Sequence, residues 1–181
     1  ELHGSSVAMR QLRQLLKKIA PANSRVLISG DMGTGKELTA RMLHALSTRA
    51  EGPFVTLSAA TMAPERMEEE LFGIEAAPGI EQRVGALEEA HGGTLFIDEV
   101  ADMPLVTQGK VLRVLLDQTF QRVGGAKKVR VDVRIVSSTS RDLVSLIAEN
   151  KFREDLYHRL GVVLVRVPSL SERREDIPEL I

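Results

Sequence analysis

A glycine-rich segment between an apolar run and a helix-forming stretch constrains the fold of this chain more than any other feature. Residues 30–37 read Gly-Asp-Met-Gly-Thr-Gly-Lys-Glu and follow the apolar residues 26–28 and Ser29. The order strand, glycine-rich turn, helix is that of a phosphate-binding loop, in which backbone N–H groups and the positive end of the helix face an anion. It predicts that a nucleoside triphosphate is bound by Gly30, Asp31, Met32, Gly33, Thr34, Gly35, Lys36, Glu37 and Leu38.

Glu37 stands where such loops usually carry a Ser or Thr whose hydroxyl coordinates Mg²⁺. A carboxylate is also a hard oxygen donor, so Glu37 is a candidate magnesium ligand. Lys36 supplies a point charge for the phosphates. The alternative is a glycine-rich turn without function, and a second motif makes that alternative less favourable.

The second motif is residues 94–99, Thr-Leu-Phe-Ile-Asp-Glu, an apolar strand of buried, parallel-sheet character that ends in two acids. Asp98 is placed to hold the magnesium ion, and Glu99 to polarise the water that attacks the γ-phosphate. An Asp-Glu pair alone is more often a solvated strand end or a helix cap. Together with the phosphate-binding loop, Glu99 predicts hydrolysis in addition to binding.

Strand and helix signals alternate along the chain, which predicts an α/β fold with a parallel sheet covered on both faces. Ligands bind such sheets at the carboxyl ends of the strands, where both motifs fall. We expect strands over residues 26–29, 54–57, 94–97, 131–137 and 162–167, and helices over 7–20, from the loop to about 49, and over 64–71, 104–117, 141–149 and 153–160.

The composition fits one ordinary globular domain, because 43% of the 181 residues are hydrophobic. The 24 basic and 25 acidic residues nearly cancel, so the charge balance indicates neither a nucleic-acid nor a membrane surface. Cysteine is absent, which excludes disulfides and thiolate metal sites and is compatible with a cytoplasmic location. The four histidines lack metal-ligand spacing, so no metal besides the magnesium of the nucleotide is expected.

Several phrases of the sequence occur in the order found in one protein family. Together they resemble the central AAA+ ATPase domain, a P-loop NTPase, of bacterial enhancer-binding proteins, which activate sigma-54 RNA polymerase. The resemblance covers essentially the whole chain. It is carried by Gly-Thr-Gly-Lys-Glu (33–37), Glu-Leu-Phe-Gly (70–73), His-Gly-Gly-Thr-Leu-Phe-Ile-Asp-Glu-Val (91–100), Arg-Val-Gly-Gly (122–125), Phe-Arg-Glu-Asp-Leu-Tyr-His-Arg-Leu (152–160) and Glu-Arg-Arg-Glu-Asp-Ile-Pro (172–178).

The resemblance implies ATP and Mg²⁺ as cofactors and assigns roles to individual residues. Lys36 would contact the phosphates, Asp98 and Glu99 would act on magnesium and water, and Thr139 would be the sensor at the end of the fourth core strand. The segment around Gly4 resembles the stretch that contacts adenine in the family, which favours ATP over GTP.

The resemblance also assigns Arg153 and Arg159 as fingers that reach into the nucleotide site of a neighbouring subunit. A planar, permanent cation suits the charge that develops on a transferring phosphoryl group. Without the family, both arginines would be taken for surface residues. Fingers supplied by a neighbour imply self-association, as a dimer or as the hexameric ring usual in the family.

The family loop that touches sigma-54, Gly-Ala-Phe-Thr-Gly-Ala, is degenerate here. Residues 74–82, the contact loop, read Ile-Glu-Ala-Ala-Pro-Gly-Ile-Glu-Gln and lack both Phe and Thr. Alanines cannot replace an exposed aromatic anchor, which argues against classical sigma-54 remodelling. The loop and residues 83–93 resemble NtrX-type response regulators of nitrogen-related signalling. The changed positions of the loop are Ala76, Ala77, Pro78, Gly79 and Ile80.

Two further positions depart from the family pattern. Ser58 replaces an Asn that restrains the catalytic Glu, which predicts altered coupling between nucleotide state and loop movement. Ser140 replaces the His or Asn that usually follows the sensor Thr, and the sequence does not indicate a consequence.

We expect residues 1–168 to form the AAA+ core and residues 169–181 the start of a truncated helical lid. The sequence does not begin with Met, so we expect a fragment. The resemblance to NtrX-type regulators implies that the complete protein carries a receiver domain before this segment and a helix-turn-helix domain after it. Those domains would contact a sensor histidine kinase and DNA. The complete protein would regulate transcription through RNA polymerase, with or without sigma-54, in the bacterial cytoplasm. The alternative function is a nucleotide-binding scaffold that controls oligomerisation and DNA occupancy with little hydrolysis.

Overall fold

The structure is a computed structural model that describes residue 4 and residues 6–169. Leu2 and His3, the neighbours of the proposed adenine contact Gly4, lie outside the described residues. Of the predicted start of the lid at residues 169–181, all but residue 169 also lies outside them. Gly4 itself is buried. No helix of the described part is long and apolar enough to cross a membrane.

A five-stranded parallel sheet forms the centre of the molecule, in the order β2-β3-β6-β1-β7. The strand β6 therefore lies between the two strands that carry the motifs, β1 before the glycine-rich loop and β3 before the two acids. This arrangement confirms the predicted α/β fold. The strands are β1 (Val26–Ser29), β2 (Phe54–Ser58), β3 (Thr94–Asp98), β6 (Arg134–Thr139) and β7 (Val163–Arg166).

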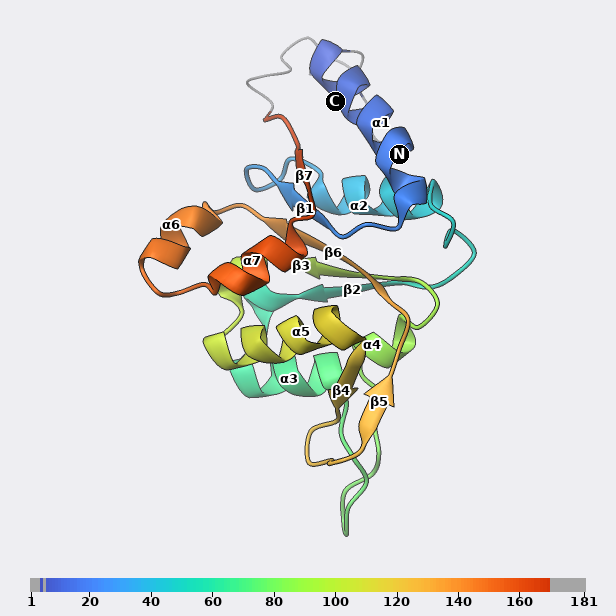
Figure 1. The fold of residues 1–181 in the computed structure, drawn as a ribbon, viewed down its shortest axis with the longest axis vertical. Helices are drawn as coiled ribbons and strands as arrows, with labels where there is room; N and C mark the ends of the chain where they lie inside the picture. Colours follow the sequence, from blue (N-terminus) through green and yellow to red (C-terminus); the bar gives the residue numbers. More distant parts are fainter. Residues whose placement is uncertain (1–3, 5, 170–181) are drawn as a thin grey trace.

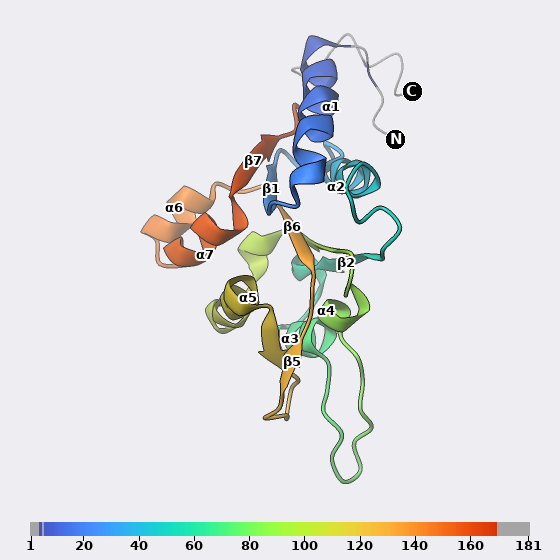
Figure 2. The ribbon, with the colours of Figure 1, turned by 45° about the vertical axis from the view of Figure 1, so that its right-hand side comes forward.

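Helices cover both faces of this sheet (Figure 1). α1 and α2 lie over one face, while α3, α4, α5 and α7 lie against the other, with α6 beside α7 (Figures 1 and 2). Their bounds are α1 (Val7–Ile19), α2 (Lys36–Ala45), α3 (Pro64–Phe72), α4 (Ala86–Glu89), α5 (Leu105–Asp117), α6 (Leu143–Ala148) and α7 (Glu154–Leu160).

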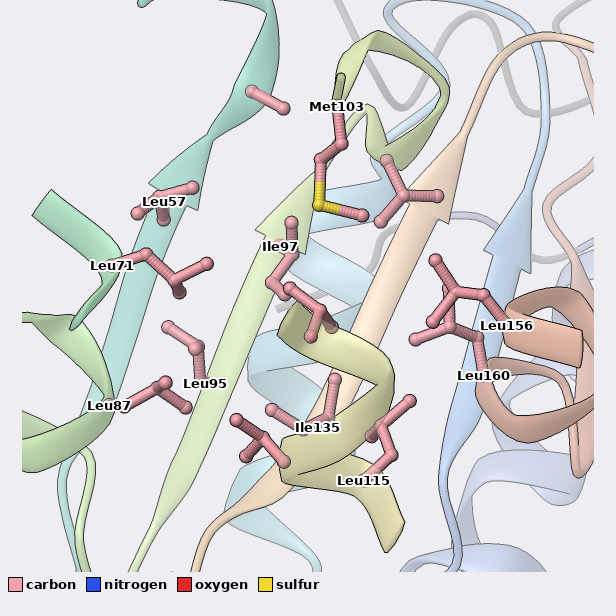
Figure 3. Close-up of a cluster of buried hydrophobic side chains, with 14 of the residues drawn as sticks. Leu57, Leu71, Leu87, Leu95, Ile97, Met103, Leu115, Ile135, Leu156 and Leu160 are labelled. Atoms are coloured by element: carbon pink, nitrogen blue, oxygen red, sulfur yellow. The ribbon is translucent and has the colours of Figure 1, made fainter. Parts of the chain in front are cut away.

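The two faces of the sheet belong to two separate hydrophobic clusters, because successive side chains of a strand point to opposite faces. In β3, Phe96 packs with the residues of α1 and α2, whereas Leu95 and Ile97 pack with those of α3, α4, α5 and α7. Figure 3 shows the second cluster, in which Leu115 and Leu156 approach the sheet from α5 and α7. Burial on both faces explains why β3 reads as a continuous apolar run.

Two of the boundaries that differ from the sequence prediction have identifiable reasons. α2 ends at Ala45, not near residue 49, because the Ser47 hydroxyl donates to the His44 carbonyl and closes the helix. β6 begins at Arg134, not at residue 131, because Gln118 bonds the backbone N–H groups of both Val131 and Val133.

The prediction also missed three short elements. One is α4, which has a single turn. The others form an antiparallel hairpin, β4 (Thr119–Gln121) with β5 (Lys128–Arg130). Strands of three residues are too short to show a clear periodicity.

Candidate nucleotide-binding site

The central strand β6 brings the two motifs together at the carboxyl edge of the sheet. On one side, the Gly30 N–H of the glycine-rich loop donates to the Thr139 carbonyl at the end of β6 (3.3 Å). On the other side, β3 pairs with β6 up to Ile97 and Ser137, so Asp98 and Glu99 emerge beside the residues that follow. The predicted phosphate-binding and acidic residues thus flank one strand end.

The loop has the backbone conformation that an anion cradle needs. Gly33 and Gly35 have φ values of +77° and +93°, which favour glycine. Gly35 is the N-cap of α2 and offers no side-chain acceptor, so the first N–H groups of the helix have no side-chain cap. Lys36 Nζ donates to the carbonyls of Gly30 (2.7 Å) and Asp31 (2.8 Å), which directs the ammonium group to the loop. These features fit a polyphosphate.

The remaining predicted loop residues differ in exposure. Thr34 is buried, whereas the side chain of Met32 is 84% exposed and Leu38 is also exposed. Glu37 lies in the first turn of α2 and forms a partly exposed ion pair with Arg41 (3.5 Å). Met32 and Leu38 therefore face solvent at the rim of the loop.

Both acids are held by serines of β6 and its extension. The Ser138 hydroxyl donates to Asp98 Oδ1 (2.5 Å). Ser140 donates its backbone N–H to Glu99 Oε1 (2.6 Å) and its hydroxyl to Glu99 Oε2 (2.5 Å). Ser58, the predicted switch residue, pairs with Asp98 through the strand register, but in the described structure its hydroxyl makes no hydrogen bond to Glu99. The sequence identified Ser140 as unusual, and the structure shows what it contacts.

Thr139, the predicted sensor, uses its hydroxyl locally. The hydroxyl donates to the Arg141 carbonyl (2.9 Å) and accepts from the Arg141 N–H (3.1 Å). Beside it lies a pocket of about 340 Å³, at the junction of the loop, the end of β6, α7 and β7. Its lining includes Gly30, Asp31, Thr139, Ser140, Tyr157 and Leu164.

The described residues contain no group of three or more His, Cys, Asp or Glu side chains that could hold a metal ion on its own. Magnesium that arrives with a nucleotide needs only one or two carboxylates, because phosphates and water complete its shell. Asp98, at the strand end beside the loop, and the exposed Glu37 are hard oxygen donors of this kind. The donor set fits magnesium carried by a nucleotide.

The two predicted finger arginines lie at opposite ends of α7. The helix begins at Glu154, so Arg153 is its N-cap and not a helical residue as predicted. Its guanidinium pairs with Asp155 through two bonds of 3.0 and 2.9 Å, which raises the pKa of Arg153 and lowers the pKa of Asp155. Arg159 is exposed in the last turn, and its carbonyl accepts from Arg25 (3.2 Å).

The contact loop forms a narrow hairpin that projects from the body at the end opposite α1 (Figures 1 and 2). Ile74 and Arg83 exchange both backbone hydrogen bonds (2.8 and 2.9 Å), as do Ala77 and Ile80 nearer the tip (3.1 and 2.8 Å). Gly79 has a φ of +78°, which the tight turn requires. The side chain of Ile80 is exposed. The contact loop is therefore ordered by its own backbone.

Arg122 joins this hairpin to its surroundings, a role that the sequence did not indicate. Its guanidinium makes two bonds to Glu88 of α4 (2.8 and 3.0 Å) and one to Glu75 at the loop base (3.2 Å). These two carboxylates raise the pKa of Arg122, so the cation persists at all ordinary pH values. The contact loop, α4 and the β4–β5 hairpin are thus tied together.

A comparison with protein families matches residues 2–166 to the sigma-54 interaction domain. The chain belongs to this family. Members of the sigma-54 interaction domain family have the AAA+ P-loop NTPase fold, and the sheet order and glycine-rich loop described above agree with it. Family membership confirms the resemblance on which the residue roles were based.

Three relatives in this family are informative. The chain is 62% identical over 178 residues to the nitrogen assimilation regulatory protein NtrX of Azorhizobium caulinodans, with 98% of this chain and 39% of the relative covered. It is 48% identical to the DNA-binding transcriptional regulator NtrC of Escherichia coli, with coverage of 99% and 39%. A crystal structure of NtrX from Brucella abortus in complex with ATP is 63% identical with a TM-score of 0.95, covering 99% of this chain and 39% of that one.

The chain therefore spans about two fifths of the length of the relatives that it matches.

Proposed function

We propose that this chain is the ATP-binding and ATP-hydrolysing oligomerisation domain of a bacterial, cytoplasmic two-component transcriptional regulator. The main support for the proposal is that the glycine-rich loop and the two acids, Asp98 and Glu99, lie on either side of the end of β6. The likeness to an NtrX that was crystallised with ATP supports ATP as the nucleotide. Residues 1–168 are the ATPase core, the lid begins at residue 169, and receiver and helix-turn-helix domains lie outside this chain.

Binding is assigned to the loop and the start of α2. The N–H groups after Gly35, which have no side-chain cap, would donate to the phosphates. The ammonium group of Lys36 would also bind the phosphates and would give up its present bonds to two loop carbonyls. Asp98 and Glu37 would hold the magnesium ion, which neutralises charge on the phosphates when it is bound. Gly4 would contact the base.

Hydrolysis is assigned to the Glu99 carboxylate. It would accept a hydrogen bond from the attacking water and orient that water toward the γ-phosphate. Thr139 would be the sensor of the phosphate at the end of β6. Its hydroxyl is engaged with Arg141, so sensing would require that these two local bonds break.

Self-association is assigned to the two arginines of the α7 region. Arg159 is exposed and free to reach a neighbouring subunit, whereas Arg153 must first leave Asp155. An assembly of this kind completes the nucleotide site only when subunits meet, so turnover would depend on protein concentration.

The contact loop would determine which partner protein the ATPase domain acts on. RNA polymerase is the proposed partner of the complete protein. A loop whose tip presents Ala77, Pro78, Gly79 and Ile80 lacks an exposed aromatic anchor, so we propose that it does not engage sigma-54 in the classical way.

The proposal is tested by measuring ATP turnover against the concentration of the full-length protein, with Glu99→Ala and Arg153→Ala as variants. Turnover per subunit should rise steeply with concentration and collapse in both variants. ATP binding without such turnover would overturn the enzymatic function and leave the nucleotide-binding scaffold. Retention of a trapped ATP transition-state analogue complex on sigma-54 would contradict the proposal about the contact loop.

A further inference from the structure

Both oxygens of the Glu99 carboxylate accept hydrogen bonds from one residue, Ser140, an arrangement called the Ser140 grip. Ser140 donates from its backbone N–H to Oε1 and from its hydroxyl to Oε2. A carboxylate offers about four acceptor positions, so this grip leaves at least one position on each oxygen open. Two bonds from a single residue fix both the position and the plane of the carboxylate.

The backbone of Glu99 has an unusual conformation that several hydrogen bonds hold in place. Glu99 has a φ of +56° and a ψ of +61°, a left-handed conformation that a non-glycine residue adopts only when its surroundings determine it. Besides the Ser140 contacts, the Glu99 N–H donates to the Ser138 hydroxyl (3.2 Å), and its carbonyl accepts from the Asp102 N–H (3.1 Å). Strained backbone held by several bonds indicates a side chain that must point in one direction.

The same strand also orients the other acid. Ser138 is completely buried and donates to Asp98 Oδ1, while its oxygen accepts from the Glu99 N–H. Hydrogen bonds shielded from water are stronger than exposed ones. Alternate residues of β6 and its extension, Ser138 and Ser140, therefore serve the two neighbouring acids of β3, whereas Ser58 on the other side of β3 bonds neither acid in the described structure.

We propose that Ser140 is the positioning residue for Glu99, and that its hydroxyl keeps the carboxylate aimed at the attacking water. Ser140 also lines the pocket beside Gly30 and Thr139, so the residue that holds Glu99 lies next to the phosphate-binding loop. This inference rests on the proposed ATP hydrolysis. It explains how this chain can orient Glu99 without an Asn at position 58.

The chemistry of the step stays with Glu99. Water hydrogen-bonds through one O–H to an open acceptor position of the carboxylate as its oxygen attacks phosphorus and the bond from phosphorus to the bridging oxygen breaks. ADP leaves with that electron pair, and the proton of the water passes by way of the carboxylate to the inorganic phosphate that forms. Ser140 exchanges no proton in this step. It keeps the carboxylate from rotating while the negative charge and the bond order change.

The test is steady-state ATP hydrolysis by the full-length protein and its Ser140→Ala and Ser140→Thr variants. Alanine keeps the backbone N–H but loses the hydroxyl bond, so kcat should fall about tenfold while KM stays within about twofold. Threonine keeps a hydroxyl and should restore most of kcat. Ser145→Ala is the matched control, because its hydroxyl also donates to a carboxylate, that of Asp142 (2.8 Å), on the exposed part of α6.

Each outcome decides the inference. A fall in kcat with Ala, rescued by Thr and absent in the Ser145 control, supports positioning. A higher kcat with Ala would overturn it, because Ser140 would then restrain Glu99. Equal losses with Ala and Thr, or a parallel drop in the unfolding midpoint, would also overturn it. Unchanged turnover with Ala would overturn this inference alone, whereas no turnover by the parent protein would overturn the proposed function as well.

Discussion

The buried Arg134 at the start of β6 offers the sharpest test of how the site is supported. Its side chain is 2% exposed and has no carboxylate partner among the described residues. It donates instead to the carbonyls of Ser24 (2.9 Å), Ala20 (2.9 Å) and Ile19 (3.5 Å), where the chain leaves α1. Burial lowers the pKa of Arg134, with a smaller contribution from the nearby charge of Arg49.

We expect Arg134→Met to destabilise the protein by about 2–4 kcal/mol. Methionine fills much of the volume, but the two carbonyls with short bonds lose their donors, and each unsatisfied buried carbonyl costs about 1–3 kcal/mol. The desolvation of the guanidinium group is recovered, which sets the upper bound. Arg134→Lys should cost less, because an ammonium group keeps the positive charge. It should still cost some stability, because an ammonium group cannot span the same carbonyls as a planar guanidinium.

Urea unfolding measures this difference, with the exposed Arg130→Met of β5 as the control that should change stability by less than about 0.5 kcal/mol. A loss below about 1 kcal/mol in Arg134→Met would refute the reasoning, because it would mean that water replaces the guanidinium bonds. A decrease in the free energy of unfolding of the full predicted size, with the slope of that free energy against urea concentration unchanged, would show that one side chain fixes β6 at its start.

Two further variants test other parts of the structure. Gly93→Ala should destabilise by about 3 kcal/mol in the same urea assay, because its Cβ would lie 2.0 Å from the Pro53 carbonyl oxygen, which already accepts from the backbone at the start of β3; stability equal to the parent would contradict this. Asp155→Asn should raise ATP turnover at low protein concentration about twofold by releasing Arg153. The pair with Arg153 lowers the pKa of Asp155, so the ion pair is complete above the ordinary pKa of Asp and is lost as the pH falls through the lowered pKa. The higher turnover of the Asn variant should therefore disappear only in acid. Slower turnover of this variant at neutral pH would count against the release of Arg153.

Buried strands and glycine-rich turns were predictable from the sequence because each carries its signal locally. β3 has an apolar centre at residues 95–97, and its bounds were predicted to within one residue. The loop of residues 30–37 was predictable because two of its glycines, Gly33 and Gly35, occupy left-handed conformations that other residues disfavour. The order of the strands agrees with the expectation that both motifs meet at one edge.

The contacts of Ser140 and Arg122 were not predictable, because they depend on segments far apart in the chain. Ser140 reaches Glu99 across the pairing of β6 with β3, at a point where Glu99 has a left-handed backbone that no sequence pattern announces. Arg122 was part of a recognised phrase, but its partners Glu75 and Glu88 lie in segments that no periodicity connects to it. Side-chain pairing across a fold leaves little trace in a single sequence.

The projecting hairpin of the contact loop has a consequence for how such chains can diverge. Changing the length of a surface hairpin alters the cost of closing it only slowly, and its tip does not take part in either hydrophobic cluster. A single inserted or deleted residue in β6, by contrast, would turn its serines away from both acids at once. The loop to which we assign partner selection can therefore change in sequence and length while the proposed nucleotide site stays intact, so one core of this fold can be inherited by regulators that act on different targets.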